Sequence, residues 1–169
     1  MGAKRLAQVG VLSAVALILF VVEAQIPLPI PLPGIKLGIA NIVTVFAVFC
    51  IGAKEAALIL TVRVFLGAVF AGNFSTVFYS AGGGCLAILV TIFIKGKLLP
   101  SQIWVAGCLG AIAHAVGQMG VAMVISGTWM LAVYLPVMVA CAVVTGLFTG
   151  LSAQFLINRG AKLWKTFLK

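Results

Sequence analysis

Arg63 is the residue whose chemistry is most informative, because it lies near the middle of the apolar run Ala56–Ala71, which predicts a membrane-spanning helix. A charged side chain at the centre of a bilayer costs roughly 2.5–3.5 kcal/mol on insertion scales, so it is expected to face a bundle interior or a wet cavity. The polar residues expected beside it are Asn41, His114 and Gln118. We expect this group to form a functional site.

The chemistry that these side chains offer is capture of an anion or a polar headgroup. Arg63 supplies a fixed positive charge with a planar fork of donors, and His114 can donate or accept a hydrogen bond near neutral pH. The amides of Asn41 and Gln118 add hydrogen bonds without adding charge. Glu23, near the outer end of the first predicted span, can pair with Arg63 or cap the site. These five residues are the predicted contacts of a small anionic or amphiphilic ligand.

A structural role is the alternative for the same residues. Buried Asn, Gln and His side chains often bridge helices within membranes. Arg63 can equally be paired with Glu23 or with Glu55, which are the only two acidic residues. Both roles stay open at this point.

The composition indicates which elements position these side chains. Hydrophobic residues make up 64% of the 169 residues and charged residues 8%, which leaves too little polar surface to cover a soluble globule. The apolar stretches have the length of helices and lack the sustained alternation of a membrane β-barrel. The sequence therefore predicts an all-α integral membrane protein with a single transmembrane domain over residues 1–169.

Six membrane-spanning helices are predicted from the apolar runs. They are Leu6–Ala24, Leu37–Gly52, Ala56–Ala71, Thr76–Ile94, Ile103–Ser126 and Trp129–Ile157. The second and third are short for a hydrocarbon core about 30 Å thick, so we expect little tilt, local thinning of the bilayer, or a helical hairpin within the bundle. The sixth is long enough to extend beyond the bilayer, and Pro136 is expected to kink it.

The candidate residues are expected at similar depths in the membrane, judged by their distances from the outer ends of their helices. Arg63 lies about nine residues from the outer end of its span, Gln118 about eight and His114 about twelve, at 1.5 Å per residue. Asn41 lies about four or five residues from its outer end. All four are therefore expected in the middle or outer half of the bilayer, with His114 and Gln118 on one helix face.

The basic residues determine the predicted orientation. With six spans, one side of the membrane carries Lys4, Arg5, Lys54, Lys95, Lys97, Arg159, Lys162, Lys165 and Lys169, and the other side carries Lys36. The positive-inside rule then places both termini in the cytoplasm. The net charge of +9 is explained by attraction to anionic lipid headgroups, and no nucleic-acid partner is predicted.

The first span and the connection after it each have two interpretations. The first span resembles a cleavable signal peptide in its basic start, its apolar core and the small residues around Glu23, but a retained first helix is the favoured interpretation. The segment Gln25–Gly34 alternates Pro with apolar residues, which predicts an extended backbone. That segment is either a stiff connector or an apolar lid over the outer mouth of a cavity.

Small residues predict where helices approach closely. The pairs Gly146-x-x-x-Gly150 and Gly10-x-x-x-Ala14 and the run Gly82–Gly84 are all of this kind. We expect tight packing within the bundle; the first helix can instead dock another membrane subunit, and the triple Gly can instead break its helix. The cysteines lack metal-ligand spacing and are expected to be inert core residues, namely Cys50, Cys85, Cys108 and Cys141.

Missing residue types exclude several enzyme classes. The chain has no Asp, so it lacks the paired carboxylates that hold Mg²⁺ on a diphosphate in an aspartate-rich prenyl-transfer site. It also lacks the Gly-rich P-loop that binds ATP. We therefore predict no enzymatic activity, no cofactor and no metal, and energised transport would need partner subunits or an ion gradient.

Several motifs together resemble a known family. They are Leu37–Thr44, Arg63 with Gly67, Gly110–Gln118, Tyr134–Pro136, and Gly146 with Gly150. In order and spacing, over nearly the whole chain, they are similar to the bacterial Gx transporter family, also labelled heptaprenyl diphosphate synthase component I. Ala115 departs from the family pattern, in which Asn commonly follows the His.

The resemblance implies a six-helix fold similar to the substrate-binding S components of energy-coupling factor transporters, in a bacterial cytoplasmic membrane. It implies a ligand held toward the outer side, and small residues on the first helix that dock to a coupling subunit driven by two ATPases. A binding and transport subunit is thus the favoured function. The alternative is a non-catalytic membrane anchor or regulatory partner of a prenyl diphosphate synthase or of an extracellular redox protein.

Overall fold

A computed structural model describes residues 2–25, 38–72 and 74–160 of the chain. These residues form six α-helices, two short 3-10 helices and no strand. The α-helices are α1 (Ala3–Glu23), α2 (Asn41–Cys50), α3 (Ala53–Ala71), α4 (Ser75–Lys95), α5 (Ile103–Ser126) and α6 (Leu135–Arg159). The 3-10 helices are η1 (Pro100–Gln102), before α5, and η2 (Trp129–Tyr134), before α6. The prediction of an all-α protein is confirmed.

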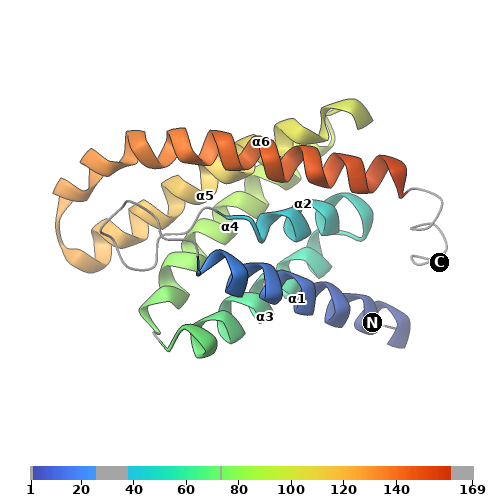
Figure 1. Ribbon diagram of the computed structural model, residues 1–169, viewed down its shortest axis with the longest axis horizontal. Helices are drawn as coiled ribbons and strands as arrows, with labels where there is room; N and C mark the ends of the chain where they lie inside the picture. Colours follow the sequence, from blue (N-terminus) through green and yellow to red (C-terminus); the bar gives the residue numbers. More distant parts are fainter. Residues whose placement is uncertain (1, 26–37, 73, 161–169) are drawn as a thin grey trace.

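The short helix α2 is at the centre of the arrangement. It packs against α1, α3, α4, α5 and α6, and Figure 1 shows it between α1 on one side and α6 on the other. Its buried residues Val43, Ala47 and Val48 join Val9 of α1 and Ile59 of α3 in one hydrophobic cluster. The helices α4, α5 and α6 form the other part of the bundle, with α5 packed against both neighbours.

Glycines let α5 and α6 approach as closely as the sequence predicts. A Cβ atom added at Gly107 would lie 2.3 Å from the Cα atom of Gly150, and one added at Gly146 would lie 2.7 Å from the Cα atom of Cys108. The backbones are thus in direct contact, as small-residue motifs allow. The predicted packing role of Gly146 and Gly150 is confirmed.

Of the other two small-residue motifs, Gly82–Gly84 packs against neighbouring helices and, among the described residues, Gly10 does not. Helix α4 runs unbroken through Gly82–Gly84, so the predicted alternative of a broken helix is wrong. Each of these glycines faces a neighbour, namely Val121, His114 or Leu60. On α1, by contrast, a Cβ atom at Gly10 would meet nothing within 4 Å among the described residues. Gly10 is therefore not used for packing within the described bundle.

Four helical segments are long and apolar enough to cross a membrane. They are Ala3–Glu23, Ser75–Lys95, Pro100–Ser126 and Trp129–Arg159. Helix α2 has only 10 residues, and α3 carries Lys54, Glu55 and Arg63. Large apolar side chains such as Phe65, Val124 and Phe148 point outward. These features indicate a multi-pass membrane protein.

Two predicted elements are corrected by the structure. The second span was predicted to begin at Leu37, but α2 begins only at Asn41, after a turn in which the Asn41 N–H donates to the Gly38 carbonyl. Pro136 lies in the first turn of α6 and does not kink it, because the first turn leaves N–H groups unbonded anyway and suits the fixed φ of proline. The predicted lid, Gln25–Gly34, lies outside the described residues after Gln25.

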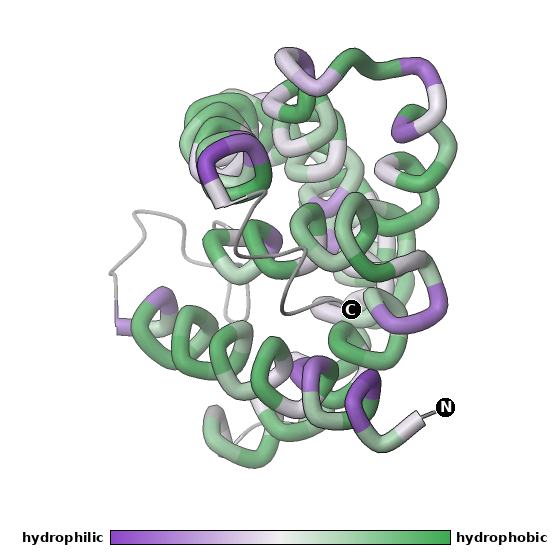
Figure 2. Tube along the Cα trace, turned by 90° about the vertical axis from the view of Figure 1, so that its right-hand side faces the viewer, coloured by the Kyte–Doolittle hydropathy of each residue, from purple (hydrophilic) through white to green (hydrophobic). Residues whose placement is uncertain are grey.

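Polar contacts gather the basic ends of the helices at one end of the bundle. Arg5 Nη1 lies 3.2 Å from Glu55 Oε1, joining the starts of α1 and α3. Lys95 Nζ donates to the Val48 carbonyl at 2.7 Å, joining the ends of α4 and α2. Figure 2, seen from where α1 begins and α6 ends, shows mostly hydrophobic helices with hydrophilic stretches near their ends. We call this the basic end; that it faces the cytoplasm stays a prediction.

Candidate functional site

All five predicted ligand contacts are buried within the bundle. None has more than 6% of its surface exposed, in a chain whose helices otherwise bury mainly Ala, Val and Ile. They come from four helices, and are Glu23 (α1), Asn41 (α2), Arg63 (α3), and His114 and Gln118 (α5). Buried polar groups that lack compensating hydrogen bonds are costly. Their presence here needs a structural or functional reason.

Glu23 connects the end of α1 to the start of α2 and to α3. Its Oε1 atom accepts a hydrogen bond from the Gly38 backbone N–H, just before α2. Its carboxylate also interacts electrostatically with the Arg63 guanidinium. Of the two acidic residues proposed as partners, Glu23 is therefore the one that interacts electrostatically with Arg63. Glu55 is wrong, because it bonds Arg5 at the basic end.

Arg63 is the centre of the charge distribution in this region. Arg63 on α3 interacts electrostatically with Glu23, and also with His114 on α5. Its Nε and Nη2 atoms are buried and have no hydrogen-bond partner among the described residues. Since a guanidinium has five N–H donors, its single carboxylate neighbour leaves donors for another acceptor.

Asn41 is held at the first turn of α2 by an unusual backbone conformation. Gly38 has a φ of +85°, and a Cβ atom there would lie 2.8 Å from Asn41 Nδ2. Glycine is therefore needed at position 38, both for its conformation and for space. Within the described part of the chain, neither Oδ1 nor Nδ2 of the buried Asn41 has a hydrogen-bond partner.

His114 lies on α5 against the glycine run of α4. A Cβ atom at Gly83 would lie 2.8 Å from the His114 carbonyl oxygen and 3.0 Å from two ring atoms. The imidazole Nδ1 atom is buried and unbonded in the described residues. Gln118 is one turn further along α5 and is also buried, so both residues lie on one face of this helix.

Contacts and electrostatic interactions connect four of the five residues into what we call the polar cluster: Glu23, Asn41, Arg63 and His114. Glu23 contacts Gly38 and interacts with Arg63, Gly38 lies against Asn41, and Arg63 interacts with His114. Five buried N or O atoms of Asn41, Arg63 and His114 lack hydrogen-bond partners in the described chain. Such a set can donate to an anionic or strongly polar group.

Two residues of α4 were not predicted from the sequence as part of a site. Gly83 gives the His114 side chain its place, although the triple Gly predicted only packing or a broken helix. Ser80 is a buried hydroxyl residue three positions before Gly83, on the same face of α4. The spacing of Ser80 from the glycine run is the signal from which it could have been found.

The cysteines differ from the prediction of core residues. Cys85 is exposed on α4, and the other three are only partly buried. The reason is that a membrane helix also presents apolar residues to lipid, so an apolar neighbourhood in sequence does not imply burial. In the described residues no three His, Cys, Asp or Glu side chains are grouped to hold a metal ion.

Comparison with known proteins supports one family. The family model of heptaprenyl diphosphate synthase component I matches residues 12–156, which include all five predicted contacts. No curated protein and no solved structure matches the chain. Component I is the non-catalytic component, so the chain is not itself an enzyme, and the family name implies a prenyl diphosphate synthase subunit as its partner. The chain therefore belongs to the heptaprenyl diphosphate synthase component I family.

Proposed function

We propose that this protein is a membrane-embedded binding subunit for a small anionic or amphiphilic, isoprenoid-related ligand, whose polar part is held by the polar cluster. The observation that carries the proposal is the set of five buried, unbonded N and O atoms of Asn41, Arg63 and His114 in the described chain. Removing polar atoms from water without partners is costly. A ligand that accepts and donates hydrogen bonds there would recover that cost.

The hydrogen-bond donors of the cluster, rather than its net charge, favour an anionic ligand. The carboxylate of Glu23 offsets the positive charge of Arg63, but the guanidinium donors Nε and Nη2 have no partner among the described residues. An anion can accept from these donors, while Asn41 and His114 bond its remaining oxygens. Carboxylates and phosphates both suit this geometry. The prenyl diphosphate named by the family makes phosphate the group to test first.

The proposed setting is a bacterial cytoplasmic membrane with both termini inside and six helices in an S-component-like bundle. We propose that uptake or transport is energised by partner subunits, a transmembrane coupling subunit and ATPases. A groove of about 480 Å³ between α1 and α3, whose walls include Gly10, Ser13 and Ala14, supports docking of a partner helix. Ser13 Oγ is buried there and unbonded within the described residues.

Binding of inorganic diphosphate to the purified protein in neutral-lipid nanodiscs, measured by calorimetry, tests this function. Arg63→Gln is expected to weaken binding more than tenfold, because it removes the charge and most of the donors. The matched control is Arg5→Gln, which removes the same charge at an exposed position of the basic end. Equal binding by wild type and Arg63→Gln, or a loss of thermal stability alone, would support a purely structural cluster.

A second candidate function is a membrane anchor or regulatory partner of a prenyl diphosphate synthase or of an extracellular redox protein. The observation that favours an anchor is the basic end, where Lys4, Arg5, Lys54, Lys95, Lys97 and Arg159 lie at helix ends. A soluble synthase subunit is expected to co-purify in gentle detergent and to dissociate at high salt. Failure to co-purify at low salt contradicts this role.

A further inference from the structure

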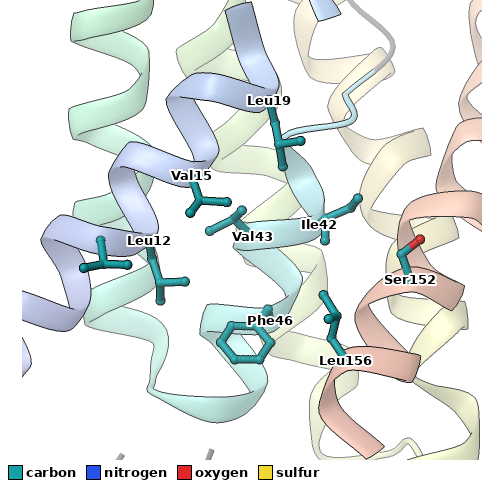
Figure 3. Close-up of a pocket in the computed structure, with 9 residues that line it drawn as sticks. Leu12, Val15, Leu19, Ile42, Val43, Phe46, Ser152 and Leu156 are labelled. Carbon is teal, nitrogen blue, oxygen red and sulfur yellow. The ribbon is translucent and has the colours of Figure 1, made fainter. Parts of the chain in front are cut away.

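A second feature is an apolar groove lined by α1 and α2, the helices that carry Glu23 and Asn41 of the polar cluster. The groove runs between α1 and α6 over the surface of α2 and has a volume of about 420 Å³. Figure 3 shows Leu12, Val15 and Leu19 of α1 facing Val43 and Phe46 of α2, with Leu156 of α6 on the other side. Its walls are apolar apart from Ser152. Such a volume is in the range of small-molecule sites.

Two residues of the groove lie close in the sequence to residues of the polar cluster. Leu19, at one end of the groove, is one helical turn before Glu23 on α1. Ile42, on its floor, directly follows Asn41 on α2. From Leu19 the groove follows α1 for seven residues to Leu12, which corresponds to about 10 Å of helix. An apolar chain starting at the cluster therefore has a path toward the basic end.

The open side of the groove gives an apolar chain a way in from the lipid. Val15 is 41% exposed, so the groove opens sideways between α1 and α6. An apolar chain can therefore enter from the hydrocarbon of the bilayer while its head stays at the polar cluster.

We infer that the α1–α2–α6 groove is a subsite for the prenyl chain of a phosphate- or diphosphate-headed lipid whose headgroup binds the polar cluster. This inference rests on the proposed function, because the headgroup orients the chain. Burial of apolar surface drives binding of the chain. Because an apolar groove accepts any lipid chain, the polar cluster supplies the selectivity for the headgroup. The ligand is then a prenyl phosphate rather than a water-soluble anion.

The test compares farnesyl diphosphate with inorganic diphosphate in neutral-lipid nanodiscs. Val15→Trp fills the groove from a partly exposed position of α1, and Ile18→Trp is the matched control, at a 62% exposed position outside the groove. Val15→Trp is expected to weaken farnesyl diphosphate binding about tenfold or more, with inorganic diphosphate unchanged. Ile18→Trp is expected to change neither affinity. Should Val15→Trp not fold, a photoreactive farnesyl diphosphate should still crosslink to groove residues in the wild type.

The other outcomes separate the two proposals. Suppose that the wild type binds inorganic diphosphate and farnesyl diphosphate equally tightly, and that Val15→Trp changes neither affinity. This result overturns the groove subsite and leaves the headgroup site intact. No binding of either compound overturns the proposed function as well. Dodecyl phosphate that binds as tightly as farnesyl phosphate overturns the prenyl assignment, since any lipid chain then fills the groove. Release of a bound polypeptide by Val15→Trp, without effect on farnesyl diphosphate, assigns the groove to a partner.

Discussion

Replacement of Gly107 by Ala should separate α5 from α6. The added Cβ atom would lie 2.3 Å from the Cα atom of Gly150 and 2.8 Å from the Gly146 carbonyl oxygen. Carbon atoms pack at about 3.5–4.0 Å, so the two backbones must move apart by about 1–1.5 Å. Both obstacles are backbone atoms, and no side chain can rotate away to absorb the change.

The size of the effect follows from two opposing contributions. Overpacking of a tight contact typically costs about 1–3 kcal/mol, while Gly to Ala inside a helix contributes about 1 kcal/mol of stabilisation. Gly120→Ala, on the same helix, is the matched control, because its Cβ atom meets nothing within 4 Å among the described residues. The helix-propensity gain cancels between the two variants. Their stabilities should therefore differ by about 1–3 kcal/mol, the packing contribution alone.

The assay is the free energy of unfolding in mixed micelles with increasing SDS, followed by circular dichroism for both variants and the wild type. Gly120→Ala is expected to equal or exceed the wild type, and Gly107→Ala to fall below it. Because α5 also carries His114, diphosphate binding should weaken in Gly107→Ala only. If the two variants unfold at the same SDS fraction, the direct backbone contact between α5 and α6 is refuted.

Three further predictions concern charges and thiols. Glu23→Gln should lower the free energy of unfolding by about 3–5 kcal/mol, because it leaves the buried Arg63 without its carboxylate, and Glu23→Gln combined with Arg63→Met should recover part of that loss in the same SDS titration. Arg5→Ala should change it by less than about 1 kcal/mol, since the Arg5 side chain is 63% exposed; a larger loss would show that the basic end is more tightly held than described. Cys85, exposed halfway along α4, should react with a charged maleimide only after the membrane is dissolved in SDS, and labelling in intact vesicles would contradict a lipid-facing position.

The sequence predicted the helices better than their ends. Apolar runs located the six α-helices of the described residues, because lipid and the bundle interior both favour apolar side chains. Of the six predicted membrane spans, only four segments are long and apolar enough to cross a membrane among the described residues. They placed the start of α3 too late, at Ala56, because hydropathy disfavours Lys54 and Glu55, whereas α3 begins at Ala53. Charged side chains are tolerated at a helix end near the polar boundary.

Burial and pairing were harder to predict than helices. Arg63 was predicted to have either Glu23 or Glu55 as partner, and only the packing of α1 on α3 decides between them. Buried hydroxyls such as Thr91 and Thr149 were missed, since each donates to a carbonyl of its own helix and leaves no pattern in the sequence. The ligand-binding role of the five predicted residues stays a prediction.

The shortness of α2 has an electrical consequence. Beyond Asn41, the buried side chains of Val43, Ala47 and Val48 pack with Ile59 and Leu60 of α3, which gives an apolar layer about 8 Å thick along α2 toward the basic end. Ions do not cross such a layer without a large desolvation penalty. We therefore expect the bundle to keep the resistance of the surrounding bilayer, although the polar cluster is buried within it. We also expect part of a membrane potential to fall across this layer, on one side of any charge held at Arg63.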